Sequence, residues 1–155
     1  MRTRTILASL AVFFAGVALA VAAENPNMGT WKLNEAKSTF SPGMTKNHTV
    51  VYAAAGDMVK VTVDGKDKDG KAAHNEWTGK FDGKDYPVTG DPTSDMRSYT
   101  RIDARTLAFT AKQEGKVTAT GRVVVAADGK SRTVSATMTD ASGKKISSTV
   151  HYDKK

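Results

Sequence analysis

The stretch that decides the fold is residues 133–152, TVSATMTDASGKKISSTVHY. Apolar or small residues alternate with Thr and Ser on both sides of a turn that contains Ser142-Gly143-Lys144. Such alternation is typical of strands with one buried face, because successive side chains of a strand point to opposite sides. Gly supplies the positive φ that a tight turn needs. The stretch therefore predicts a β-hairpin with strands over Thr133–Thr139 and Lys145–Tyr152.

The same period-two pattern continues through most of the chain before this hairpin. Short turns rich in Gly and Asp separate the runs, as at Ala55-Gly56-Asp57 and Asp128-Gly129-Lys130. These connections are too short for crossover helices, so neighbouring strands are expected to pair antiparallel. The further strands predicted are Thr30–Asn34, Asn47–Ala54, Met58–Asp64, Ala73–Phe81, Arg97–Asp103, Thr106–Gln113 and Val117–Ala126.

Two segments interrupt this meander. Glu35–Lys46 is expected to form a loop with one short helical turn, and the Gly-, Pro- and Asp-rich segment Asp82–Met96 is expected to form a mobile mouth loop. An open meander leaves two exposed edge strands, and pairing the first strand with the last removes both. We therefore expect an all-β fold, a single antiparallel up-and-down meander closed into a barrel of about eight or nine strands.

Residues 1–23 are expected to be a secretory signal peptide. Arg2 and Arg4 precede the uncharged apolar stretch Ile6–Ala20, and small residues follow at the expected cleavage site. The apolar stretch is short for a transmembrane helix, and no positive cluster follows it. The sequence thus predicts a periplasmic or secreted protein whose mature domain, residues 24–155, does not span the membrane.

The composition limits the chemistry that the mature domain can use. The chain has no Cys, which removes disulfides, thiol catalysis and Cys-based metal sites. Its formal charge is +7, or about +5 without Arg2 and Arg4, and the basic residues are scattered. Nucleic-acid binding favours a clustered basic patch, so no nucleic-acid partner is expected. An outer-membrane barrel needs an outward apolar band, whereas the outward positions here are Thr, Lys, Asp and Ser.

The two ends of the mature chain carry a family resemblance. Gly29-Thr30-Trp31 lies on the first predicted strand, and Ser148-Thr149-Val150-His151-Tyr152 lies on the last. A Gly-x-Trp on the first strand of a small meander resembles the calycin group of lipocalins, fatty-acid-binding proteins and avidins. The last strand is similar to that of a fatty-acid-binding protein, and the whole resembles small bacterial secreted proteins of unassigned function. The resemblance implies a lipocalin-like barrel with Gly29 and Trp31 at one closed end.

The sequence also departs from these families. Fatty-acid-binding proteins insert two helices after the first strand, for which Glu35–Lys46 has no room. Their last strand carries an Arg two residues before the Tyr, and here Val150 precedes Tyr152. The avidin biotin site has further Trp residues, whereas only Trp31 and Trp77 occur here. The resemblance therefore implies a fold and not a particular ligand.

Four residues are candidates for a ligand site inside the barrel. Trp77 is expected to be either core or cavity wall. Tyr99 and Arg101 are two apart on one strand, so they face the same way. Pointing inward, they are suited to an anionic head together with Tyr152, because arginine donates paired hydrogen bonds to a carboxylate. The alternative is that both face solvent while Ile102 packs inward. Room for a cavity is expected at the small residues Ala111, Ala119, Gly121 and Ala136.

Metal-binding and catalytic patterns are weak in this chain. The three histidines, His48, His74 and His151, have no recognised metal-ligand spacing. Residues 64–76 come close to a calcium loop, but Gly65 stands where the first Asp ligand is required, and hairpin turns explain the same letters. Neither a nucleophile elbow nor a phosphate-binding glycine loop occurs. We expect no metal, no cofactor and no catalytic residues.

The sequence favours an exported, non-enzymatic protein that holds a small hydrophobic or amphipathic ligand in its barrel, with Asp82–Met96 as the gate. The alternative is a protein-interaction module, such as a periplasmic inhibitor or envelope-stress factor, with a filled barrel and a protein partner. An enzyme of unknown class is the third hypothesis. The interior volume of the barrel separates the first two, because a filled barrel leaves no room for a ligand.

Overall fold

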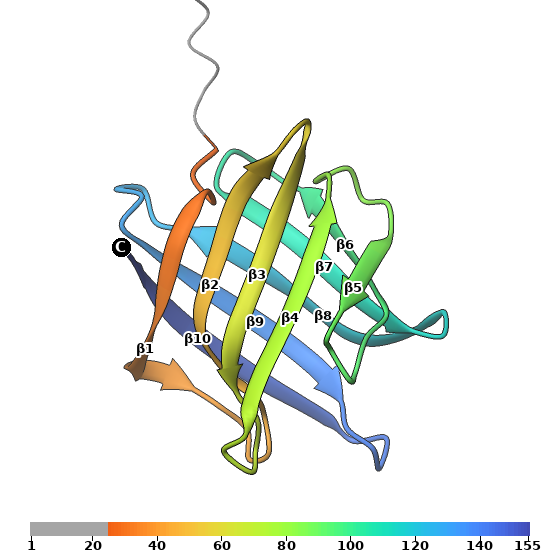
Figure 1. Cartoon of the computed structure of the whole chain (residues 1–155). Helices are drawn as coiled ribbons and strands as arrows, with labels where there is room; N and C mark the ends of the chain where they lie inside the picture. Colours follow the sequence, from red (N-terminus) through yellow and green to blue (C-terminus); the bar gives the residue numbers. More distant parts are fainter. Residues whose placement is uncertain (1–24) are drawn as a thin grey trace, which may run out of the picture.

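The computed structural model describes residues 25–155 of the chain, and the expected signal peptide lies outside them. These residues form a closed barrel whose strands follow one another around the ring in chain order (Figure 1). The ten strands are β1 (Gly29–Thr39), β2 (Lys46–Ala55), β3 (Met58–Lys66), β4 (Ala72–Gly79), β5 (Tyr86–Thr89), β6 (Met96–Arg101), β7 (Thr106–Gln113), β8 (Lys116–Val125), β9 (Ser131–Thr139) and β10 (Lys145–Lys154).

The first strand pairs with the last, as predicted. In the antiparallel ladder between β1 and β10, Trp31 lies opposite Lys154 and Leu33 lies opposite Tyr152. All other neighbouring strands are antiparallel too, so the all-β meander closed into a barrel is confirmed. The number of strands is ten, slightly more than the eight or nine predicted.

One additional piece of strand lies in the segment Glu35–Lys46, where we predicted a loop with a helical turn. The helical turn does not form, and β1 instead continues to Thr39 after an irregularity that begins at Asn34. The Ser38 hydroxyl accepts a hydrogen bond from the backbone N–H of His151 at 2.9 Å and donates to the Asn34 carbonyl at 2.7 Å. A side chain therefore supplies the link to β10 where the regular ladder is interrupted.

The other additional strand, β5, lies within Asp82–Met96, which we predicted to be a loop. Val88 lies opposite Trp77 on β4, and Tyr86 lies opposite Arg97 on β6. The strand has only four residues and includes Pro87, which has no N–H to donate to a ladder. A segment this short shows no clear alternation, so its pattern resembles that of a loop.

Aromatic side chains fill the end of the barrel at which β1 begins, the upper end in Figure 1. Trp31 is completely buried, and its indole N–H donates to the Asn27 carbonyl at 2.8 Å. Trp77 stacks on Phe81 with ring centroids 6.2 Å apart and meets Tyr99 edge-on at 4.8 Å. We call this the closed end, because these large side chains occupy the space between the strands.

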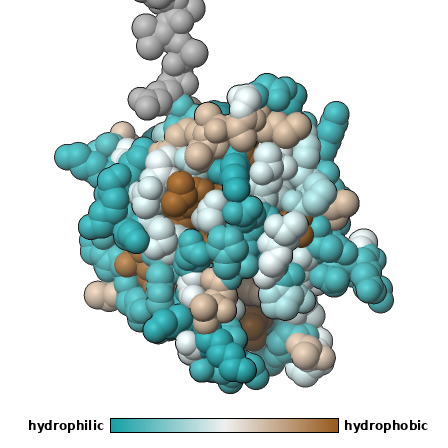
Figure 2. Space-filling view, viewed as in Figure 1, coloured by the Kyte–Doolittle hydropathy of each residue, from teal (hydrophilic) through white to brown (hydrophobic). Residues whose placement is uncertain are grey.

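The outer face of β2–β4 is covered mostly by hydrophilic residues, with hydrophobic residues visible only in separate spots (Figure 2). The alternation of buried and exposed positions along these strands produces this distribution. None of the residues that the structure describes belongs to a helix long and apolar enough to cross a membrane.

Gly121 lies where the barrel wall is too closely packed for a side chain. A Cβ at this position would collide with the Ser135 carbonyl oxygen and the Phe109 ring. Gly121→Ala is therefore expected to lower the free energy of unfolding by about 1–3 kcal/mol, measured by urea denaturation. The control is Thr120→Ala, at an exposed neighbouring position, with an expected change within about 0.5 kcal/mol. Equal stability of the Gly121→Ala variant and the wild type would contradict this packing.

Candidate ligand-binding cavity

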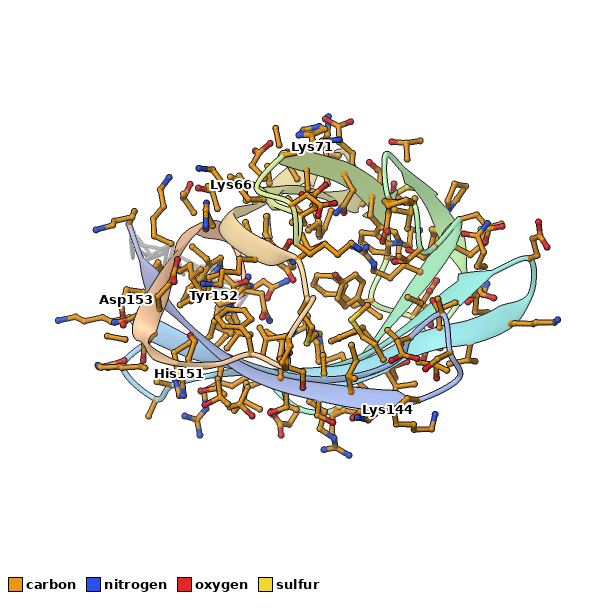
Figure 3. The ribbon with its side chains drawn as sticks, turned by 90° about the horizontal axis from the view of Figure 1, so that it is seen from below. Lys66, Lys71, Lys144, His151, Tyr152 and Asp153 are labelled. Carbon is orange, nitrogen blue, oxygen red and sulfur yellow. The ribbon has the colours of Figure 1, made fainter. Side chains whose placement is uncertain are left out.

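A cavity of about 600 Å³ occupies the barrel below the aromatic closed end. It reaches the surface among the loops at the opposite end, where Phe40, Met44 and Pro92 line it. Figure 3 views the barrel from this open end, with Lys66 and Lys71 beside the β3–β4 turn and Lys144 in the β9–β10 turn. The volume lies within the range of about 300–1,000 Å³ that is usual for small-molecule sites.

Period-two alternation places one face of each long strand against the cavity. Tyr152 points into the ring of strands, whereas its neighbour His151 points away from it (Figure 3). Val and Ala are the most frequent residues of the lining, because strands with one buried face carry small and β-branched residues at the inward positions. Three of the four small residues from which we expected room line the cavity, namely Ala111, Ala119 and Ala136. The fourth, Gly121, lies beneath the Phe109 ring.

Two of the predicted ligand residues, Tyr99 and Tyr152, line the cavity, and their side chains are buried. Trp77 does not belong to the lining, because it is buried behind Tyr99 in the aromatic closed end. Its indole N–H donates to the backbone carbonyl of Arg97 at 2.8 Å. Trp77 thus supports the cavity wall from behind. Gly29 and Trp31 lie at the closed end, where the indole of Trp31 is beneath the cavity floor.

Arg101 lies outside the cavity, which separates it from Tyr99. It is the last residue of β6, its side chain is exposed, and its guanidinium lies 5.9 Å from the centre of the Phe81 ring. The two residues lie two apart on β6, but Tyr99 is buried whereas Arg101 is exposed at the end of the strand. Ile102 is 49% exposed, so it does not pack inward either.

Two arginines that sequence reasoning missed line the cavity, Arg97 and Arg132. Arg97 precedes Tyr99 by two residues, and Arg132 precedes Val134 by two, so the alternation already places both on inward faces. Arg97 has partners. Its Nη2 lies 3.3 Å from an Asp91 carboxylate oxygen, and both of its Nη atoms lie 3.4 Å from Asn75 Oδ1.

Arg132 has no carboxylate or amide partner among residues 25–155. Only 3% of the residue is exposed, and its guanidinium carbon lies 4.6, 4.8 and 5.1 Å from the ring centres of Trp31, Tyr52 and Tyr152. Its Nε and Nη1 atoms are buried without a hydrogen-bond partner among residues 25–155. The floor of the cavity therefore combines a positive charge with three aromatic faces.

The tyrosines at the floor are neutral at physiological pH. Burial raises the pKa of Tyr152 to about 12, although nearby Arg132 acts in the opposite direction. Burial also raises the pKa of Tyr52, and Tyr99 adds to this increase. Both hydroxyls consequently keep their protons, and neither cancels the charge of Arg132.

No protein-family model matches the chain, and no curated protein matches its sequence. Among solved structures, the chain is similar to the redesigned β-barrel mFAP1 bound to DFHBI, with 16% identity over 83% of this chain and 95% of that chain and a TM-score of 0.44. It is similar to EF1p2_mFAP2b bound to DFHBI at 13% identity, over 84% and 94%, with a TM-score of 0.48. It is also similar to lobster apocrustacyanin A1, with 14% identity over 86% of this chain and 63% of that chain and a TM-score of 0.45. The strand pairs of the chain itself define its closed antiparallel barrel.

Because Tyr152 is buried, we expect the folded protein to lose stability at alkaline pH. An unfolded tyrosine ionises near pH 10, whereas Tyr152 in the folded barrel ionises near pH 12. The stabilisation that comes from the neutral, buried Tyr152 is therefore fully present below pH 10. The free energy of unfolding falls as the pH rises from about 10 to 12. Tyr152→Phe is expected to make this fall shallower, as measured by urea denaturation at a series of pH values. An unchanged slope would show that Tyr152 ionises normally.

Proposed function

We propose that this protein is an exported, non-enzymatic binding protein that holds a small hydrophobic or amphipathic molecule inside its barrel. The observation that carries the proposal is the cavity of about 600 Å³, which reaches the surface at one end and is blocked by aromatic residues at the other. An apolar enclosure with a few polar groups is the usual form of a small-molecule site.

Ligand exchange in this proposal takes place through the open end. The segment Asp82–Met96, which we expected to act as the gate, is shortened by β5, so only the loop after Thr89 remains at the opening. Within that loop Asp91 accepts hydrogen bonds from the hydroxyls of Thr93 and Ser94, at 2.8 and 2.6 Å. Because these bonds hold the loop, we propose that exchange requires displacement of Phe40 and Met44, which also line the cavity.

The cavity is also the feature that favours this proposal over a protein-interaction module. That alternative was expected to have a filled barrel, in which large side chains occupy the interior. The positions of Ala111, Ala119 and Ala136 instead leave space between the strands.

Among residues 25–155, no group of three or more His, Asp or Glu side chains is arranged to hold a metal ion.

Uptake of a ligand is tested with the mature protein and a lipid extract of its host, analysed by native mass spectrometry. The wild type is expected to retain a lipophile in a 1:1 complex, which denaturing extraction then identifies. A double variant, Ala119→Phe with Ala136→Phe, fills the cavity and is expected to lose this uptake. Absence of uptake by the wild type would overturn the proposal.

The control for cavity filling uses the same substitution on the outside of the barrel. Thr120 and Ser135 are exposed neighbours of the two alanines on the same strands. The double variant Thr120→Phe with Ser135→Phe is expected to bind as the wild type does. Equal loss in both double variants would show that added aromatic bulk, and not a filled cavity, prevents uptake.

Export is tested separately by fractionation of the host and N-terminal sequencing. The proposal expects the protein in the periplasm or the medium, with its N-terminus near Glu24, because residues 1–23 have the pattern of a cleaved signal. Full-length protein in the cytoplasmic fraction would overturn this part of the proposal and leave the binding function untouched.

A further inference from the structure

The two arginines inside the barrel differ in how their charge is balanced. Arg97, near the open end, has the carboxylate of Asp91 and the amide oxygen of Asn75 as partners. Arg132, at the floor, belongs to none of the salt bridges formed by residues 25–155. The interior of the barrel therefore contains one uncompensated positive charge, and its position is at the closed end.

The surroundings of Arg132 offset only part of the cost of burying this charge. The rings of Trp31, Tyr52 and Tyr152 lie around the guanidinium and attract it electrostatically. The Nε and Nη1 atoms nevertheless have no hydrogen-bond partner among residues 25–155. A buried, charged donor without an acceptor is unfavourable, so an acceptor from outside the chain is expected here.

None of the carboxylates among residues 25–155 provides this acceptor. The acidic residues that line the cavity are Asp67 and Asp91, and both lie in loops at the open end. Asp91 is already engaged by Arg97, Thr93 and Ser94. Among the described residues, Trp31 is completely buried at the other end, and Arg132 lines the cavity that reaches the surface at the open end.

We infer that Arg132 binds the head group of the ligand and that this ligand is a lipophilic monocarboxylic acid. The carboxylate would lie at the floor, where arginine donates hydrogen bonds in a geometry that matches its two oxygens. Hydroxyls from Tyr52 and Tyr152 line the same part of the cavity and can donate to it. The hydrocarbon chain then extends between Val61, Val134 and Ala136 towards the open end. This inference rests on the proposed binding function.

The balance of charge among the cavity residues predicts a ligand with a single negative charge. Of the two arginines that line the cavity, only Arg132 lacks a carboxylate partner among residues 25–155, since Asp91 neutralises Arg97. A dianionic ligand would leave one of its charges inside the barrel without a cationic partner, which is unfavourable. The inference thus assigns the ligand an acid group at one end and an uncharged chain at the other.

The wild-type protein allows a test that does not depend on a variant. Its affinities for hexadecanoic acid and hexadecan-1-ol are compared by isothermal titration, because these probes share a chain and differ in the head group. The acid is expected to bind at least about tenfold more tightly. Equal affinities would overturn the inference while the binding function stands. Uptake of neither probe would count against the inference and the binding function together.

Two variants locate the head group. Arg132→Met replaces the guanidinium with an unbranched apolar side chain. This variant is expected to lose the preference for the acid over the alcohol. Arg101→Met removes an arginine outside the cavity and is the matched control, with an unchanged preference expected. A preference that survives Arg132→Met would place the head group elsewhere and overturn the inference.

A spectroscopic readout keeps the inference testable if Arg132→Met does not fold. Hexadecanoic acid labelled with ¹³C at its carboxyl group is bound to the wild type, and its chemical shift is followed with pH. A guanidinium beside the carboxylate favours the charged form, so the pKa of the bound acid is expected below that of the same acid in aqueous solution. A bound acid with an unchanged or raised pKa would overturn the inference.

Discussion

The pairing of β1 with β10 is the contact on which the rest of the structure depends. An open meander would expose the unpaired backbone groups of both end strands. Closure satisfies these groups and turns one face of every long strand towards a shared interior. The pairing continues past the irregularity after Asn34 because the Ser38 hydroxyl takes the place of a ladder acceptor for His151. The enclosed cavity exists only because this seam is closed.

The interior changes character along the barrel axis. Large aromatic residues such as Trp31 and Trp77 fill the closed end, whereas small residues such as Ala119 and Ala136 occupy inward positions further along. The cavity is therefore produced by the distribution of side-chain sizes on the inward faces. The charge of Arg132 lies where these two regions meet, so a molecule that enters from the open end passes the polar loop residues and the apolar wall before it reaches the cationic floor.

Most of the fold was predictable because its signals are local. Alternation and Gly-containing turns indicate strands and hairpins from a few residues at a time. The prediction failed where local signals are short or broken. Strand β5 has four residues and contains Pro87, and the continuation of β1 after Asn34 follows an irregularity that disrupts the alternation. In both places, hydrogen bonds to neighbouring strands stabilise the extended conformation. The local sequence pattern does not reveal these hydrogen bonds.

For the site, the sequence by itself determined which side chains share a face, because alternation relates Arg97 to Tyr99 and Arg132 to Val134. Only the tertiary structure decided which arginine is neutralised. Asp91 reaches Arg97 from the neighbouring loop, whereas closure of the barrel brings Arg132 on β9 against rings from β1, β2 and β10. The balance of charge inside the barrel depends on contacts between strands distant in sequence, and the spacing of residues along one strand does not contain that information.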